Sequence, residues 1–454
     1  MTKLQNIYDN SPIIIQNLIV SLSGFNKFNQ RYGRIYFEHR KFLKEFESWE
    51  KEKKINYQLK KLNEFINFAR KNSKFYKKLY SNIPDKPLNE INDLKRFPII
   101  TKEMIRENLD EIITIPKWKG IISHTGGTTG KSLEVVFTKE DVMRRMAMLD
   151  HFKSRFGFEN RLMRRATFNG QHIVPPNQKN KIFWRYNISC KQMIYSSFHT
   201  SEENLKYYCE SLNSFKPQSI DGFFSSIVDL ASYIKRKKIK LKFKPIAIFP
   251  TSEKVLKEDK ELIEEVFQCK VYDQYASSEG APFITECEKG NLHIELSTGV
   301  FEFIDENSKE IVVTSFDTKG TPLIRYRIGD SIEAIDFNFN CSCGIQSPIV
   351  KEINGRTTDF LVTIDGVRIN AGNVANLFKN LHNSVIKSQI VQVSKDNIII
   401  KLVVDKRIYK KEYDNQLHDE FLHKFGSKMK IEIQHVEEIE KESSGKYRFI
   451  INRI

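Results

Sequence analysis

The sequence has little cysteine and no long apolar run. Its 454 residues include six cysteines, too few for the disulfide framework of a small secreted protein. Apolar runs such as Leu18-Ile19-Val20 fall far short of the roughly 20 residues that a membrane span needs. The first ten residues carry charges and lack the apolar core of a signal peptide. We therefore expect a cytoplasmic protein that is not inserted in a membrane.

Negative charge is scarce relative to positive charge. The 73 lysines and arginines outnumber the 57 aspartates and glutamates, which gives a formal net charge of +16. A positive field of this kind attracts polyanions and phosphate-rich substrates. The basic residues are spread in short runs, however, and we find no basic arm and no recognisable nucleic-acid-binding motif. We expect a lysine-rich surface and no nucleic-acid partner.

Helical patterns and short strand patterns alternate through most of the chain. Apolar residues at three- and four-residue steps predict one helix around 59–69 and another around 227–234. Short apolar runs at 246–249 and 271–275 are typical of buried strands. This alternation predicts an α/β fold in which helices cover the faces of several sheets, after a mainly helical N-terminal part at residues 1–95.

The pattern changes after about Gly355. The elements expected in this part are two strands, a polar helix and a further strand, at residues 390–393, 398–404, 411–424 and 431–433. Together they would form a small α+β domain. We therefore expect a large multi-sheet α/β domain at 1–355 and a small, mobile α+β domain at 356–454. The turn-prone Asn354-Gly355 pair would be the hinge between them.

A segment rich in glycine and threonine is the most informative part of the sequence. It comprises His124, Thr125, Gly126, Gly127, Thr128, Thr129, Gly130, Lys131 and Ser132. Glycines let the backbone approach a ligand, and successive N–H groups, hydroxyls and a lysine can then donate to phosphate oxygens. The segment is not a P-loop, because Thr125 stands where that motif requires its first glycine. A phosphate-binding loop and a plain turn after a strand both remain open.

Three further segments carry groups that suit a nucleotide site. Tyr275 and Glu279 lie in a Tyr-Ala-Ser-Ser-Glu turn after an apolar run, where a ring can stack on a base and a carboxylate can hold magnesium. Asp330 ends a Tyr-Arg-Ile-Gly-Asp segment; its carboxylate could accept hydrogen bonds from a ribose, and the nearby arginines could meet phosphate. Lys446 lies in a Ser-Gly-Lys sequence near the C-terminus. Each segment alone is equally consistent with a simple turn or surface loop.

Taken together and in this order, the motifs resemble the adenylate-forming superfamily of acyl-CoA synthetases, luciferases and peptide-synthetase adenylation domains. A Gly-Arg-x-x-Asp motif at 355–359 completes the set, and the resemblance extends from about Ile99 to the C-terminus. The chain is more closely similar to the phenylacetate-CoA-ligase-like branch, especially to members associated with capsular polysaccharide biosynthesis. The segments similar to that branch are 96–102, 168–176, 183–187 and 196–199.

The resemblance implies a role for each motif residue. The residues that would wrap the ATP phosphates are Thr125, Gly126, Gly127, Thr128, Thr129, Gly130 and Lys131. Tyr275 would stack on adenine, Asp330 would bind the ribose hydroxyls, and Arg356 would contact ribose or phosphate. Glu279 would help to hold Mg²⁺. Lys446 would reach the acyl carboxylate and the α-phosphate, where it would offset the charge that develops during attack.

These roles imply an enzyme that uses ATP and Mg²⁺ to convert a small carboxylic acid into an acyl-adenylate and then transfers the acyl group to coenzyme A. Transfer to an amine, such as that of an amino sugar in surface polysaccharide biosynthesis, is an alternative second step. A relative that only binds a nucleotide or polyanion is a further alternative. Two departures stand out: His124-Thr125 replaces the usual Ser-Gly opening of the loop, and Thr358 stands where the superfamily has its hinge carboxylate.

Cysteine and histidine gather in two segments before the expected hinge. Cys287 and His293 are six residues apart, and Cys341 and Cys343 follow about fifty residues later. Three thiolates and one imidazole can form a tetrahedral zinc site, which is structural when all four ligands come from the protein. The spacing is not that of a standard zinc finger. Unligated buried cysteines therefore remain the alternative.

Overall fold

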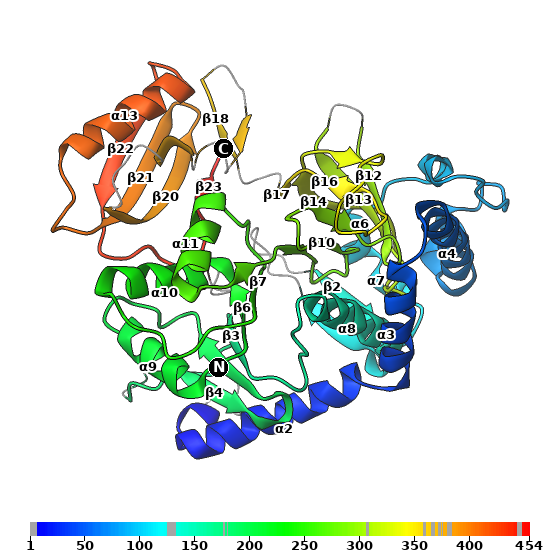
Figure 1. Ribbon diagram of the computed structural model, residues 1–454. Coiled ribbons are helices and arrows are strands. Elements are labelled where there is room, and N and C mark those ends of the chain that lie inside the picture. The colour runs from blue at the N-terminus through cyan, green and yellow to red at the C-terminus, as the bar shows by residue number, and fades with distance from the viewer. Residues whose placement is uncertain are drawn as a thin grey trace.

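The chain, described here by a computed structural model, contains several sheets with helices around them (Figure 1). The described residues are 7–124, 133–175, 178, 180–305, 308–356, 360–364, 368–370, 374, 376–378, 384–442 and 447–454. Helices and strands are interleaved along the chain, so the α/β prediction is confirmed. In the part of the chain so described, none of the helices combines the length and hydropathy that crossing a membrane requires.

Helices make up the N-terminal part. They are α2 (Ile13–Arg31), α3 (Arg34–Glu47), α4 (Lys51–Asn72) and α5 (Lys74–Leu79). The apolar stripe predicted around 59–69 lies on α4, where Leu62, Phe65 and Ala69 are buried. These residues belong to one core with Tyr326 and Ile324 of a neighbouring sheet. The N-terminal helices are therefore packed on the sheets and are not an appendage.

A six-stranded sheet provides the edge at which a ligand would bind. Its strands in spatial order are β4 (Trp184–Asn187), β5 (Gln192–Ser196), β3 (Arg165–Asn169), β6 (Ser219–Phe223), β7 (Ala247–Thr251) and β8 (Lys270–Val271). All neighbouring strands are parallel except β4 and β5. The helices between them are α9 (Leu205–Phe215), α10 (Phe224–Lys237) and α11 (Lys257–Phe267). The carboxyl ends of the parallel strands share one edge, the usual ligand side of such sheets.

Two antiparallel sheets adjoin the six-stranded one. One contains β12 (Gly299–Phe303), β13 (Glu310–Ser315), β14 (Leu323–Ile332) and β17 (Ile353–Arg356). The other contains β15 (Ile335–Asp336), β16 (Ile349–Val350), β11 (Leu292–Ile294), β10 (Ile284–Glu286) and β9 (Gln274–Tyr275). The single strand predicted at 271–275 is wrong, because β8 and β9 belong to different sheets. Gly355, expected in a turn, pairs with Ser331 of β14.

The C-terminal residues form a four-stranded sheet with a core of its own. Its strands in spatial order are β22 (Lys430–His435), β21 (Asn397–Val404), β20 (Val385–Ser394) and β23 (Ile450–Asn452), and the helix beside it is α13 (Glu412–Phe425). Ile390, Ile400, Leu417 and Phe421 are buried between the sheet and the helix. The strands and the polar helix predicted for this part are confirmed. Figure 1 shows this unit above α10 and α11.

Candidate active site

The glycine- and threonine-rich segment lies between the two strands of a hairpin. Residues Thr125–Lys131, expected to bind phosphate, lie outside the described residues. The hairpin strands on either side are β1 (Ile121–His124) and β2 (Glu134–Phe137). The Ser123 hydroxyl donates to the backbone oxygen of Ser278 at 3.2 Å. The start of the expected phosphate loop is thereby held beside the Tyr-Ala-Ser-Ser-Glu turn.

Tyr275 and Asp330 meet across two sheets. The Tyr275 hydroxyl donates to Asp330 Oδ2 at 2.7 Å. Burial, reinforced by the negative charge of Asp330, raises the pKa of Tyr275 well above its usual range, so the phenol stays a hydrogen-bond donor. Asp330 also pairs along the backbone with Arg356, whose side chain lies outside the described part of the chain. Tyr275 and Asp330 thus meet through their side chains, and Asp330 and Arg356 meet through their backbones.

Glu279 lies beside Lys102, the last residue of the 96–102 segment. Its Oε1 is 3.8 Å from Lys102 Nζ, and its Oε2 accepts a hydrogen bond from the Ser278 hydroxyl at 3.3 Å. Lys102 begins α6 (Lys102–Glu107), a helix that Thr101 caps. Mg²⁺ takes oxygen ligands and is often held by one or two carboxylates together with phosphate oxygens and water. A nearly buried carboxylate beside the expected phosphate loop fits that requirement.

The turn that carries Glu279 is fixed by Gly280 and by helix α8 (Lys139–Ser154). Gly280 has a φ of +103°, and a Cβ added there would lie 2.6 Å from Thr318 Cγ2, so only glycine fits. Arg145 of α8 donates to the backbone oxygens of Gly280 at 2.8 Å and Ala281 at 2.9 Å. No sequence motif marks Arg145, because its role depends on how α8 packs.

The two arginines before Asp330 have other partners. Arg325 pairs with Glu302 at 3.2 Å and donates to the backbone oxygen of Phe97 at 2.6 Å. Arg327 pairs with Glu310 at 2.7 Å. Both guanidinium groups are therefore paired with carboxylates, and their contact with phosphate stays a prediction.

The C-terminal unit touches the large sheet at the carboxyl end of β7. The backbone N–H of Tyr447 donates to Glu253 Oε1 at 3.1 Å. Glu253 lies two residues after the end of β7 and also accepts a hydrogen bond from the backbone N–H of Ser225 at 2.6 Å. Lys446 lies outside the described residues, but its neighbour in the chain is anchored at this edge.

Two lysines strengthen this contact between the C-terminal unit and the large sheet. Lys387 of β20 lies 2.9 and 3.0 Å from the two carboxylate oxygens of Asp229 on α10. Its ammonium group also lies 4.6 Å from the centre of the Tyr447 ring. Lys441 donates to the Thr200 hydroxyl at 2.8 Å. None of these contacts was predicted, because each joins distant segments that carry no motif.

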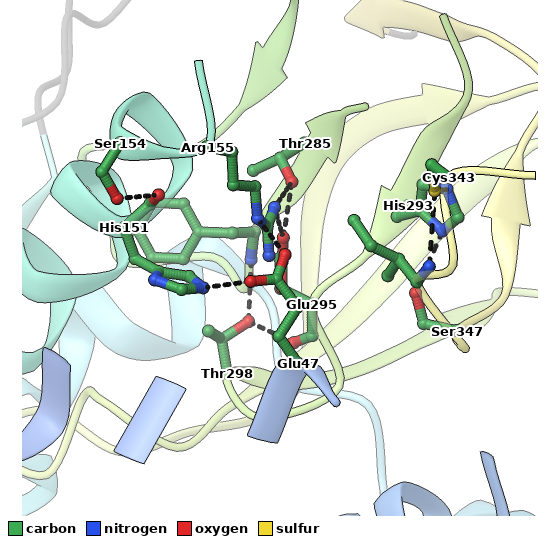
Figure 2. Close-up of polar contacts among 12 residues, drawn as sticks. Glu47, His151, Ser154, Arg155, Thr285, His293, Glu295, Thr298, Cys343 and Ser347 are labelled. Atoms are coloured by element: carbon green, nitrogen blue, oxygen red, sulfur yellow. Dashed lines mark hydrogen bonds and ion pairs between the residues drawn. The ribbon is translucent and has the colours of Figure 1, made fainter. Parts of the chain in front are cut away.

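Cys287, His293, Cys341 and Cys343 converge, as predicted. One ligand atom from each lies within 4.8 Å of the others. The Cys287 and Cys341 sulfurs are 3.8 Å apart, and Cys343 Sγ is 3.4 Å from His293 Nε2. His293 Nδ1 lies 3.2 Å from the Ser347 hydroxyl (Figure 2). Burial lowers the pKa of His293, which favours the neutral imidazole that a metal ion requires.

A buried charge network lies beside this cluster, on the same stretch of chain as His293 (Figure 2). Arg155 of α8 contacts Glu295, which follows β11, at 2.6 Å, and Glu47 of α3 at 2.6 Å. His151 Nε2 lies 3.2 Å from the same Glu47 carboxylate. The network joins the N-terminal helices to the sheet that carries the Cys/His cluster. Sequence analysis missed it, since its members come from three separate segments.

Known proteins are similar to this chain in sequence or in fold. In fold, the chain is similar to 2-hydroxyisobutyryl-CoA ligase in the postadenylation state in complex with 2-HIB-AMP. The TM-score is 0.71 at 16% identity, with 90% of this chain and 91% of that chain covered. For the same ligase with 2-HIB-AMP and CoA in the thioesterification state, the TM-score is 0.54 at 17% identity, with the same coverage.

In sequence, the chain matches a family model and a curated relative. The model of the CapK C-terminal domain matches residues 361–453. Protein CapK of Staphylococcus aureus is 40% identical over 455 residues, which cover 99% of this chain and 100% of that protein. An alignment of this length and identity spans nearly the whole chain. The chain therefore belongs to the CapK family.

Proposed function

We propose that this protein uses ATP and Mg²⁺ to convert a carboxylic acid into an acyl-adenylate with release of pyrophosphate. The acyl group would then pass to coenzyme A. The observation that carries the proposal is the meeting of separate motifs: Ser123 bonds to Ser278 beside Glu279, and Tyr275 of the same turn bonds to Asp330. A protein without a nucleotide site has no evident need to gather these groups.

In this proposal, the nucleotide binds along the Tyr275–Asp330 pair. Asp330 would accept hydrogen bonds from the ribose hydroxyls, and Tyr275 would contact the adenine and hold the Asp330 carboxylate in place. The loop from Thr125 to Lys131 would bind the phosphates. Glu279 would hold Mg²⁺, which when bound neutralises phosphate charge. Lys102, next to Glu279, would add a positive charge on the same side.

Lys446 is the proposed catalytic lysine, and the contact made by Tyr447 would bring it to the proposed active site. We propose that Lys446 acts at this edge of the sheet, because the residue after it, Tyr447, is bound to Glu253 near the carboxyl end of β7. The higher TM-score to the postadenylation state than to the thioesterification state supports an arrangement suited to adenylation. We propose that residues from 356 onward rotate against residues 1–355 before the second step.

ATP–pyrophosphate exchange with a set of carboxylic acids tests the proposal directly. We expect exchange with at least one acid, and a loss on the order of 100- to 1000-fold in Lys446→Ala with ATP binding retained, because the lysine acts mainly in the transition state. Lys428→Ala, an exposed lysine of the same unit, is the matched control and should keep full activity. A protein that binds ATP but exchanges with no acid would be a non-catalytic relative. Supplying coenzyme A or amines as acceptors then identifies the second step.

We also propose that Cys287, His293, Cys341 and Cys343 hold one structural Zn²⁺. Their convergence within 4.8 Å supports this, and four protein ligands leave no open position for a substrate. The ion would tie the hairpin after β10 to the segment before β16. It would brace the sheet that carries Tyr275 without taking part in the reaction.

A further inference from the structure

Helix α2 turns its apolar side to solvent. The exposed residues are Ile14, Ile15, Leu18, Ile19, Leu22 and Phe25, with exposed fractions between 39% and 82%. At 3.6 residues per turn these positions share one side of the helix. Figure 1 shows α2 along the outer edge of the molecule, with the rest of the protein on one side of it. A surface helix of a soluble protein normally has the opposite orientation.

The opposite side of α2, on which Gln16, Val20 and Gly24 are buried, is fixed against the protein by specific contacts. Arg185 Nε donates to Gln16 Oε1 at 2.6 Å, and the backbone N–H of Tyr186 donates to Asn17 Oδ1 at 2.9 Å. A Cβ added at Gly24 would lie 2.3 Å from Asn187, so the helix also approaches its neighbour closely there. Turning α2 to bury its aliphatic side chains would break these contacts. The outward apolar face is therefore part of the folded state.

The region beside this face is apolar and basic. Ile188, whose N–H donates to a serine hydroxyl of α2, is 69% exposed. Leu162 is 67% exposed, and its backbone oxygen accepts a hydrogen bond from Lys191 at 3.0 Å. The guanidinium of Arg161 lies 5.3 Å from the centre of the Phe28 ring on α2. Apolar side chains and cations therefore continue from α2 onto the adjoining loops.

The charged side chains of α2 itself are all positive. The helix contains no aspartate or glutamate, and its charged residues, Lys27 and Arg31, lie near its C-terminal end on the side away from the apolar face. Arg161 and Lys191 add positive charge beside the helix. The whole chain carries a net charge of +16. An anionic surface complements such a region, and its attraction extends over about one Debye length.

We propose that α2, by its apolar face together with Ile188 and Leu162, docks on the surface of an anionic lipid bilayer. An interfacial helix lies in the membrane plane, with its apolar side chains sunk about 5–10 Å into the headgroup boundary and basic residues at the anionic lipids. The docked helix does not cross the bilayer. The acid and the acceptor of the proposed reaction play no part in this inference, which concerns a different face of the molecule.

A second copy of the chain fits this face less well. Ile14 to Phe25 covers about 17 Å of helix at 1.5 Å per residue. A stable protein interface takes about 800 Å² from each partner, which is more than one such stripe supplies. Both copies would also carry the same charge of +16. The small apolar area and the basic surroundings together favour lipid over self-association.

Vesicle co-sedimentation of the full-length protein tests the proposal. We expect binding to vesicles of phosphatidylglycerol and phosphatidylcholine that weakens with salt, and little binding to phosphatidylcholine alone. Leu18→Gln/Leu22→Gln should reduce affinity by about 100-fold, since each leucine side chain buried in the bilayer contributes on the order of ten-fold. Phe337→Gln/Ile408→Gln removes two apolar side chains exposed elsewhere and should bind like wild type.

Each other outcome overturns the proposal. These outcomes are wild-type protein that stays in the supernatant with anionic vesicles, binding that survives Leu18→Gln/Leu22→Gln, and equal loss in the control variant. Light scattering tests one further outcome. If the wild-type protein is a dimer and Leu18→Gln/Leu22→Gln is a monomer, the apolar face of α2 binds a second copy of the chain and not lipid. If that double variant does not fold, Ile14→Gln, at a position 82% exposed, replaces it. Pyrophosphate exchange without vesicles should be equal in all variants, which separates this test from that of adenylation.

Discussion

The hydroxyl of Tyr275 donates a 2.7 Å hydrogen bond to the carboxylate of Asp330, and this bond joins β9 of one sheet to β14 of another. Tyr275 belongs to the turn that carries Glu279, and Asp330 pairs with Arg356 at the start of the C-terminal part. The geometry of the turn and that of the strand therefore depend on each other at this point. Any change in the position of Asp330 should alter the geometry of the proposed nucleotide site.

Tyr275→Phe tests the hydrogen bond without removing the ring. A hydrogen bond to a charged group contributes about 1.5–3 kcal/mol, so we expect the Michaelis constant for ATP to rise by roughly ten-fold or more with little change in turnover. Asp330→Ala should raise it further, because the ribose contact is lost as well. Steady-state pyrophosphate exchange at varied ATP measures both. A defect confined to turnover in Asp330→Ala would assign that residue another role.

Glu279→Gln should increase the magnesium concentration needed for half-maximal activity and lower turnover. A neutral amide holds a hard cation less well than a carboxylate does. The comparison variant is Glu288→Gln, which changes an exposed carboxylate of another turn and should leave the magnesium dependence unchanged. The measurement is exchange activity across a magnesium titration. Superimposable curves for Glu279→Gln and wild type would remove Glu279 from the metal site.

Cross-linking position 229 to position 387 should separate the two half-reactions. Asp229 and Lys387 are in contact in the arrangement that we assign to adenylation. In Asp229→Cys/Lys387→Cys, the oxidised protein should keep pyrophosphate exchange but lose acyl transfer, and reduction should restore transfer. The reduced double variant and each oxidised single variant are the controls. Transfer at the wild-type rate in the fully cross-linked protein would exclude rotation of the C-terminal unit.

Protein purified without chelator should contain about one zinc per chain, given four converging ligands. Cys341→Ser/Cys343→Ser should lose the metal and lower the melting temperature, because metal binding contributes to folding stability. Cys190→Ser/Cys269→Ser, at cysteines outside the cluster, should retain the metal. Elemental analysis and thermal unfolding measure the two effects. Metal-free protein whose thiols at 341 and 343 react freely would contradict the site.

Stability should fall as the solution becomes acidic, partly through His39. Burial, together with the positive charge of Arg144, lowers the pKa of His39 to about 3. The unfolded state binds this proton near pH 6.5 and the folded state only near pH 3, so stability is present above that window and is lost as pH falls through it. His39→Phe should flatten the dependence of the urea midpoint on pH in this range. His418→Gln, a partly exposed histidine, should not.

Local sequence patterns predict the helices and strands, whereas the contacts between them are seen only in the folded structure. The apolar spacing on α4 and the strand patterns of the C-terminal sheet each lie within one segment, so the sequence alone reveals them. Lys102 and Arg145 reach the Glu279 turn only through tertiary packing, and neither stands in a motif that specifies this contact. Helix α2 shows the same limit, because periodicity marks its apolar side without telling which side meets the protein.

In strand β14 the number of residues is constrained more strongly than their identity. Its backbone pairs with Ile100 near one end and with Arg356 near the other, and Asp330, which makes the second of these pairings, must also face Tyr275. Successive side chains of a strand point to opposite faces, so one inserted or deleted residue would turn Asp330 away from Tyr275 and the proposed nucleotide site. Insertions between Leu323 and Asp330 should therefore be rejected during evolution. The connection from β15 to β16 can vary in length, provided that Cys341 and Cys343 still reach the other two residues of the Cys/His cluster.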